Sequence, residues 1–272
     1  MIRYTLTDLN RQFPDEAACL GFLFQARYPQ GLDCKRCGRN VKHYPIKNTQ
    51  TYACGNCGWL VSPTANTIFH KSATPLRSWF YAVFLMANTR TGISAKQLQR
   101  ELGVTYKTAW RMFTQIRKMM AEDIRGMGPT VEADETYIGG KRKGDVGKPG
   151  PGSNKIATFG IVERHGRAFT RVIPDVRART VMPLIWQHVP AHQDFTVNTD
   201  ELGSYNRLKR LGYNHVRVNH HIGEYVRGNV HTNTIEGFWS LVKRGISGVH
   251  HSVGANHLQS YLDAYTFRYN RR

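Results

Sequence analysis

Two pairs of cysteines constrain the fold of this chain more than any other feature. Each pair has two residues between its cysteines and a glycine directly after it, and sixteen residues lie between the pairs. The four cysteines are Cys34, Cys37, Cys54 and Cys57. This spacing is typical of a structural zinc ribbon, in which four thiolates hold one Zn²⁺ tetrahedrally. Gly38 and Gly58 suit the tight turns that bring backbone N–H groups close to the sulfurs.

The cysteine pairs have two other interpretations. Two disulfides would suit an oxidising compartment, and disulfides are rare in the cytosol. A redox-active pair would need a thioredoxin-like unit around it, and the flanking sequence does not resemble one. A zinc ion with four protein ligands has no open position for a substrate, so we expect a structural role. The fifth cysteine, Cys19, stands among Ala, Leu and Phe and is expected to be a buried thiol without chemistry.

The charge of the chain predicts a polyanionic partner. Its 38 Lys and Arg against 19 Asp and Glu give a net charge of +19 over 272 residues. Nucleic acid is the favoured partner, because each neutralised phosphate releases a counterion and adds affinity. A membrane surface would also attract this charge, yet the sequence shows no apolar run of 18 residues, N-terminal signal or lipidation motif. We therefore expect a cytoplasmic protein that does not associate with membranes.

The pattern of apolar residues divides the chain into four modules. They are a helical lead-in over 1–28 with an amphipathic helix from Asp15 to Arg27, the zinc ribbon over 29–73, a helical region over 74–127, and a large module over 128–272.

The helical region contains three predicted helices, at about 75–86, 95–102 and 106–120. The last two have the size of a helix-turn-helix. Three basic residues lie beside an apolar stripe of Ala109, Trp110, Phe113 and Ile116; they are Lys107, Arg111 and Lys118. This pattern favours DNA binding, and an ordinary helical hairpin with solvated basic residues is the alternative.

The large module has the pattern of an α/β domain. Strand-like runs occur at 130–138, 155–163, 167–173, 194–199 and 214–219, and helical patterns at 178–189, 203–211, 233–244 and 255–268. Three consecutive strands followed by alternating helices and strands predict a mixed sheet flanked by helices. The segment 139–155 is too rich in Gly, Pro and Lys for regular structure. It is either a mobile loop or a DNA-contacting loop that uses Lys141, Arg142 and Lys143.

Three acidic residues of the large module are candidate ligands for a divalent metal: Asp134, Asp200 and Glu236. Carboxylates suit Mg²⁺, and two such ions about 3.5–4 Å apart can stabilise both oxygens of a phosphoryl displacement. Lys243 lies two helical turns after Glu236 on the same predicted face, where it can hold a phosphate. A basic chain with this triad is suited to cutting or joining a nucleic-acid backbone.

Each acid also has a plainer interpretation. Glu132 or Glu135 could replace Asp134 as the ligand, and Asp200 could only cap a following helix. Asn233 and Glu236 have the spacing of a capping box. Glu224 is the other late acid considered.

Together these motifs resemble the ISXO-like group of bacterial insertion-sequence transposases, a branch of the DDE transposases. The resemblance covers nearly the whole chain and is carried by the zinc ribbon and by DExYIGGK, NTDExxxY, HTNTIEGFWSxxKRGI and YLDxYxFRYNRR. It implies a ribonuclease-H-like catalytic fold, dependence on Mg²⁺ or Mn²⁺, recognition of terminal inverted repeats, and strand cleavage followed by strand transfer. It also implies a homo-oligomer on DNA, with Lys243 and Arg244 among the DNA contacts. The third acidic position can be Asn in that group, and here it is Glu236.

The sequence also fits a second function, from another class of protein. A zinc ribbon and a helix-turn-helix also suit a DNA-binding regulator whose catalytic fold no longer cuts. Nucleases with a His-hydrophobic-His motif are disfavoured, because the paired histidines of this chain are directly adjacent. Tyrosine and serine recombinases are disfavoured because no Arg and His cluster surrounds a nucleophile.

Overall fold

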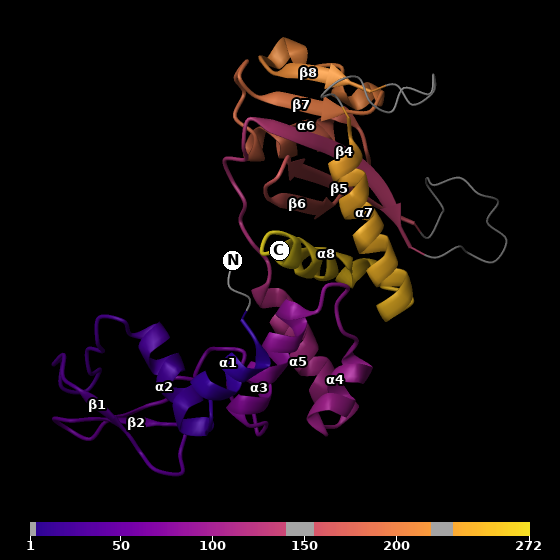
Figure 1. Cartoon of the computed structure of the whole chain (residues 1–272). Coiled ribbons are helices and arrows are strands. Elements are labelled where there is room, and N and C mark those ends of the chain that lie inside the picture. The colour runs from indigo at the N-terminus through magenta and orange to yellow at the C-terminus, as the bar shows by residue number, and fades with distance from the viewer. Residues whose placement is uncertain (1–3, 140–154, 219–230) are drawn as a thin grey trace. The chain divides into compact units, whose positions relative to one another are not determined.

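A computed structural model describes residues 4–139, 155–218 and 231–272 of the chain (Figure 1). The chain divides into two compact units. The first runs up to residue 88 and includes 95–116, and the second contains 89–94 and 117–272. The four module boundaries proposed above stay predictions. None of the helices that the structure describes combines the length and hydrophobicity needed to cross a membrane.

The first unit begins with two short helices and a small antiparallel sheet. Helix α1 spans Leu6–Gln12, α2 spans Glu16–Arg27, and the sheet consists of β1 (His43–Pro45), β2 (Tyr52–Cys54) and β3 (Leu60–Val61). The amphipathic helix was predicted with Asp15 as its first residue, and Asp15 is its N-cap. Helix α1 was not predicted, although Thr5 and Asp8 form a capping box at its start.

Three further helices follow in the chain, and the last of them ends in the second unit. They are α3 (Leu76–Asn88), α4 (Ala95–Leu102) and α5 (Tyr106–Met119), and all three were predicted. The start of α3 is capped from a distance, because the Glu16 carboxylate accepts the backbone N–H groups of Leu76 and Arg77 at 2.8 Å each.

One residue of the apolar stripe predicted for α5, Trp110, does not lie on its buried side. Trp110 is 37% exposed, whereas Ala109, Met112 and Phe113 are buried. The buried stripe follows the 3.6-residue period from Ala109, and Trp110 is rotated off it by one residue.

The second unit is built on a mixed five-stranded sheet. Its strands are β4 (Thr130–Ile138), β5 (Ile156–Glu163), β6 (Ala168–Val172), β7 (Thr196–Thr199) and β8 (Asn214–Arg217), in the order β6-β5-β4-β7-β8. The first three strands are antiparallel neighbours, and β7 and β8 run parallel to β4. This arrangement confirms the predicted α/β class and the ribonuclease-H-like mixed sheet.

Helices cover both faces of this sheet (Figure 1). On one face, α6 (Ala178–His188) packs its Val181, Met182 and Ile185 against Val131 and Ala133 of β4. On the other, α7 (Asn233–Gly245) and α8 (Ala255–Tyr269) share a core with β4, β5 and β6. A π-helical turn, Ile246–His250, follows α7. Because side chains of β4 alternate between the two faces, each residue of this strand faces one core or the other.

The helix predicted at 203–211 was wrong. Only two short 3-10 turns form there, Gly203–Tyr205 and Lys209–Leu211. The second turn ends at Gly212, whose φ of 92° is left-handed. Glycine at the start and left-handed glycine at the end leave too few residues for a stable α-helix.

Candidate metal centre

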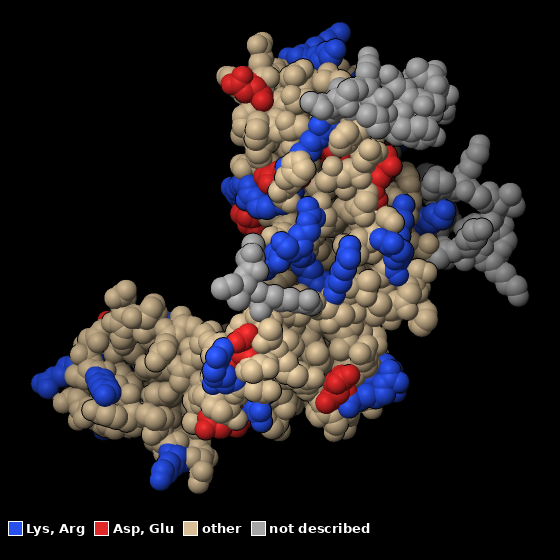
Figure 2. Space-filling view, in the orientation of Figure 1, with Lys and Arg blue, Asp and Glu red and all other residues tan. Residues whose placement is uncertain are grey.

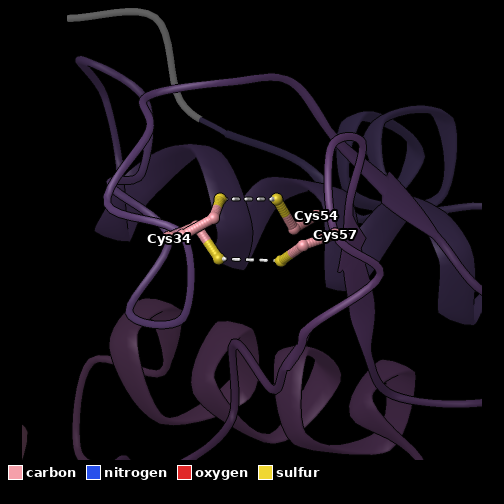
Figure 3. A group of neighbouring side chains, drawn as sticks. Cys34, Cys54 and Cys57 are labelled. Atoms are coloured by element: carbon pink, nitrogen blue, oxygen red, sulfur yellow. Dashed lines mark hydrogen bonds between the residues drawn. The ribbon is translucent and has the colours of Figure 1, made fainter.

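The four predicted cysteines lie together in the first unit (Figure 3). Their four sulfur atoms all lie within 4.8 Å of one another. The Cys34 and Cys57 sulfurs are 3.5 Å apart, and those of Cys37 and Cys54 are 3.9 Å apart. A tetrahedral zinc ion with Zn–S bonds of about 2.3 Å places its sulfurs about 3.8 Å from one another. The cluster therefore fits one zinc ion.

Gly38 and Gly58 close the turns that contain the two cysteine pairs, as the sequence predicted. The N–H of Gly38 donates to the carbonyl of Cys34 at 2.8 Å, and Gly58 donates to Cys54 at 2.9 Å. Both glycines are left-handed, with φ of 67° and 70°, a conformation that costs glycine little.

The state of the thiols also favours a metal over a disulfide. The described cysteines are all free, and Cys19 is buried apart from the cluster. The backbone N–H of Arg39 lowers the pKa of Cys37 to about 6, which favours its thiolate form. Against the lowering effect of the Trp59 backbone N–H, burial and hydrogen bonds with the neighbouring thiols raise the pKa of Cys57 to about 11.

The acidic candidates of the second unit come together through the register of the sheet. Glu132 of β4 pairs with Asn198 of β7 in the last rung of their parallel ladder. Extending that register by two residues places Asp200, just past the end of β7, beside Asp134. Carboxylate oxygens of Asp134, Glu135 and Asp200 lie within 4.8 Å of one another. The sheet thus brings two of the three predicted ligands together and adds Glu135.

Burial and mutual repulsion disfavour the charged forms of these acids. Burial raises the pKa of Asp134 to about 8, and the charges of Glu135, Asp200 and Glu236 add to this rise. Burial likewise raises the pKa of Glu135 to about 7, against the hydrogen bond that Tyr205 donates to it. Carboxylates concentrated in this way are stabilised by a bound cation.

Glu135 enters the group from the opposite side of the strand to Asp134. Its Oε2 accepts a hydrogen bond from the hydroxyl of Tyr205 at 2.5 Å, and Tyr205 is completely buried in the core that faces α6. The sequence offered Glu135 only as an alternative to Asp134. Asp200, which directly follows β7, has a carboxylate oxygen within 4.8 Å of oxygens of both adjacent acids.

Asp200 has a second contact, which matches its plainer interpretation in part. Its Oδ1 accepts the N–H of Leu202 at 3.0 Å. This bond holds the turn after β7, although no α-helix follows. One oxygen of Asp200 therefore orders the turn while the carboxylate stays within reach of Asp134.

Glu236 lies on the first turn of α7, the helix that packs on β4 and β5. The N-cap of α7 is Thr232, so the capping box proposed for Asn233 and Glu236 is not formed. Instead, the hydroxyl of Thr232 donates to Oε1 of Glu236 at 2.8 Å. Glu236 is near enough for its charge to raise the pKa of Asp134. Glu224, the other late acid, lies outside the described residues.

The predicted DNA-binding residues differ in whether their charged groups already contact other groups of the protein. Lys107, Lys118, Lys243 and Arg244 are exposed on their helices, and Arg244 also donates to the carbonyl of Ser240 at 3.3 Å. Arg111 is also exposed, but it donates to the carbonyl of His70 at 3.2 Å and lies over the ring of Trp79.

Two further observations concern the basic surface. On the face shown in Figure 2, Lys and Arg side chains gather over the part of the second unit that contains α7 and α8. Lys141, Arg142 and Lys143 lie outside the described residues.

Two protein-family models match the chain. An ISXO2-like transposase domain matches residues 125–270, and a transposase zinc-ribbon domain matches residues 14–59. The first match contains Asp134, Asp200 and Glu236, and the second contains all four clustered cysteines.

Curated relatives agree with these models. An uncharacterized protein in transposable element ISH50 of Halobacterium salinarum is 28% identical over 274 residues, covering 95% of this chain and 92% of that protein. An uncharacterized transposase-like protein of Haemophilus influenzae is 29% identical over 104 residues, covering 38% of this chain and 81% of that protein.

Solved structures show only a weak likeness. A pre-cleavage Mos1 transpososome matches with 10% identity over 69% of this chain and 73% of that chain, with a TM-score of 0.31. A simian T-cell lymphotropic virus intasome matches with 12% identity over 69% of this chain and 64% of that chain, also at 0.31.

Proposed function

The chain belongs to the ISXO2-like transposase family, and from this premise we propose that it is an active DNA transposase. It binds the terminal inverted repeats of its own element, cuts them in a metal-dependent reaction and joins the cut ends to target DNA. Asp134, Asp200 and Glu236 are its metal ligands, and Glu135 lies close enough to be a fourth. The partner is DNA, bound by a dimer or a larger homo-oligomer.

The observation that carries this proposal is the convergence of acids from the middle of β4 and the end of β7 in a chain with net charge +19. Buried carboxylates in mutual contact destabilise a fold unless a cation offsets their repulsion. Oxygen donors of this kind suit Mg²⁺ or Mn²⁺. Two such ions, when bound, stabilise the attacking and the leaving oxygen of a phosphoryl transfer.

The remaining residues of the site act on the DNA. Lys243 is exposed on α7, and its position seven residues after Glu236 places both on one side of the helix. Its ammonium group can therefore bind a backbone phosphate next to the carboxylates. Arg244 and the exposed basic residues of α5 provide attraction that does not depend on sequence.

The zinc cluster has a separate task under this proposal. Its four thiolates come from residues 34–57, a segment with only two short strands of its own. A zinc ion would supply the folding energy that so small a segment lacks. The ordered ribbon is then available to bind DNA.

The test is cleavage of DNA that carries the element's own ends, with Mg²⁺ or Mn²⁺, by the wild type and by Asp134→Asn and Asp200→Asn. Both substitutions keep the side-chain size and remove one metal-binding charge. We expect both variants to bind the ends as the wild type does and to cut none of them. A wild type that binds the ends without cutting at any metal concentration would instead indicate a DNA-binding regulator.

A further inference from the structure

Glu132 is an acid of the second unit that the proposed chemistry does not use. It lies on β4 two residues before Asp134, so both side chains point to the face covered by α7. Its side chain is completely buried. A buried carboxylate is costly unless its oxygens are hydrogen-bonded, so its contacts reveal its role.

Both oxygens of Glu132 accept hydrogen bonds from the first turn of α7. Oε2 accepts the backbone N–H groups of Thr234 at 2.8 Å and Ile235 at 3.0 Å. Oε1 accepts the hydroxyl of Thr234 at 2.8 Å. The N-cap residue of α7 makes no side-chain capping bond of its own. Glu132 therefore satisfies the free N–H groups that begin the helix, at the end where a negative charge is favoured.

Two cationic or titratable groups complete this arrangement. Nε of Arg164 donates to Oε1 of Glu132 at 3.1 Å, and Arg164 also donates to the carbonyl of His231 at 3.2 Å. Nδ1 of His231 lies 3.2 Å from the same oxygen. Strand β4, the residue that follows β5 and the entry to α7 are thus tied together through one carboxylate.

A glycine sets the separation between α7 and the sheet close to the same place. Gly160 of β5 is the register partner of Asp134. A Cβ atom on Gly160 would lie 2.6 Å from the indole ring of Trp239, and Trp239 stands one helical turn after Glu236. The helix therefore packs directly on backbone beside Asp134.

From these contacts we propose that Glu132 is a positioning residue, which anchors α7 so that Glu236 reaches the Asp134 and Asp200 carboxylates. It binds no metal itself, because donors already occupy both of its oxygens. The inference rests on the proposed function, since it requires Glu236 to be a metal ligand.

The test is a double-mutant cycle on Mn²⁺ affinity, measured by calorimetric titration of DNA-free protein. Glu132→Gln keeps the shape but replaces one acceptor oxygen with an amide NH₂ group, so that donors of α7 or of Arg164 lose their acceptor. In otherwise wild-type protein we expect it to weaken Mn²⁺ binding about tenfold, as loss of an outer-shell partner does. In the Glu236→Gln background the same change should have little further effect, because the ligand that it positions is already gone.

The matched control is Glu163→Gln. Glu163, at the end of β5, also accepts two backbone N–H groups, of Gly128 and Arg167, and a hydrogen bond from the Arg167 side chain. It makes none of these bonds with α7. We expect its Mn²⁺ affinity to be unchanged even where its melting temperature falls, which separates positioning from general loss of stability.

The outcomes distinguish the inference from its premise. If Glu132→Gln weakens Mn²⁺ binding equally in both backgrounds, or not at all, the positioning role is wrong and the proposed function stands. If Glu236→Gln alone leaves Mn²⁺ binding unchanged, then Glu236 is not a ligand and both fail. Should Glu132→Gln not fold, Thr234→Val removes one of the four hydrogen bonds and keeps the backbone donors. The cycle then predicts a smaller loss of affinity with the same dependence on Glu236.

Discussion

The thiolate cluster and the carboxylate cluster are built on opposite principles. The four cysteines come from residues 34–57, and each pair is held by a turn that ends in a left-handed glycine. The acids come from β4, from the end of β7 and from the first turn of α7, more than one hundred residues apart at the extremes. One site is a property of a short segment, and the other exists only when the whole sheet is formed.

This difference determines what can disturb each site. A local cluster fails when one of its ligands is lost, and changes elsewhere leave it intact. An assembled cluster fails in addition when the strand register shifts or when a helix docks differently, although every ligand is still present. Burial of Glu132 and the bare backbone at Gly160 are the devices that keep α7 in place.

The largest effect is expected from loss of a zinc ligand. Structural zinc binding is worth about 10–16 kcal/mol in small zinc domains, so Cys34→Ser should release the zinc and unfold the ribbon. The acidic site lies in the other compact unit, so its Mn²⁺ affinity should stay unchanged. Metal analysis of purified protein and calorimetric titration measure the two results.

Cys19→Ser provides the control for this prediction. Cys19 is buried and free but is not in the cluster, so one zinc per chain should remain. Zinc retained by Cys34→Ser at full stoichiometry would show that the cluster is not the binding site.

The next largest effect concerns the third acid. Glu236→Gln should lower metal-dependent cleavage by at least about 100-fold, more than loss of a typical outer-shell partner. Its melting temperature should change little, because Glu236 is exposed and is not the cap of α7. Single-turnover cleavage and thermal unfolding give the two measurements.

Thr232→Val is the companion variant for the same site. It removes the hydroxyl that donates to Glu236 at 2.8 Å and should reduce the rate by less than Glu236→Gln does. An active Glu236→Gln together with an inactive Glu224→Gln would identify Glu224 as the ligand instead.

The local site could be predicted from the sequence almost completely. Cysteine spacing and the two glycines indicated the zinc ribbon, because the interactions involved span only a few residues. The strand 130–138 was likewise predicted at its observed bounds, since alternation along one strand is a local pattern. The missed helix α1 and the false helix at 203–211 are short, and packing decides such segments more than propensity does.

For the assembled site, the sequence predicts candidate ligands but not the contacts that position them. Nothing near Glu132 in the sequence indicates that it caps a helix 102 residues later. The spacing of Asn233 and Glu236 suggested a local cap, but Glu132 on strand β4 supplies the cap. Glu135 was visible as an acid, yet only the packing of Tyr205 shows that it joins the cluster.

A smaller effect separates the docking of α7 from the ligands themselves. Gly160→Ala places a methyl group against Trp239 and should destabilise the protein by about 1–3 kcal/mol, as overpacking does. It should also weaken Mn²⁺ binding, because the helix that carries Glu236 must move. Denaturant unfolding and calorimetric titration report these two effects.

Gly237→Ala is the matched control, on α7 next to Glu236. An added Cβ there meets nothing within 4 Å, so alanine should stabilise the helix by about 0.5–1 kcal/mol. Equal Mn²⁺ affinity of Gly160→Ala and wild type would show that α7 tolerates displacement and that its docking does not tune the site.

The last effect is a pH dependence that comes from the carboxylate cluster. The folded protein holds the pKa of Asp134 at about 8, above the unfolded value of 3.8. The folded state therefore binds more protons than the unfolded state between those values, and metal-free protein loses stability as pH rises through this window. Asp134→Asn removes the titrating group. Between pH 5 and 7, the unfolding free energy of Asp134→Asn should rise relative to that of the wild type by up to about 1.4 kcal/mol per pH unit.

For Glu163→Gln, the difference in unfolding free energy from the wild type should not change with pH over the same range. Hydrogen bonds from Arg167 and Gly128 outweigh burial and lower the pKa of Glu163 below its usual 4.5. Its stabilising contribution is therefore lost only as pH falls below that value. Saturating Mg²⁺ should remove the slope of the Asp134→Asn difference, because the cation then balances the charge that the cluster carries. If the slope is absent without metal, burial and the neighbouring charges do not raise the pKa of Asp134, and the cluster is looser than the sheet register implies.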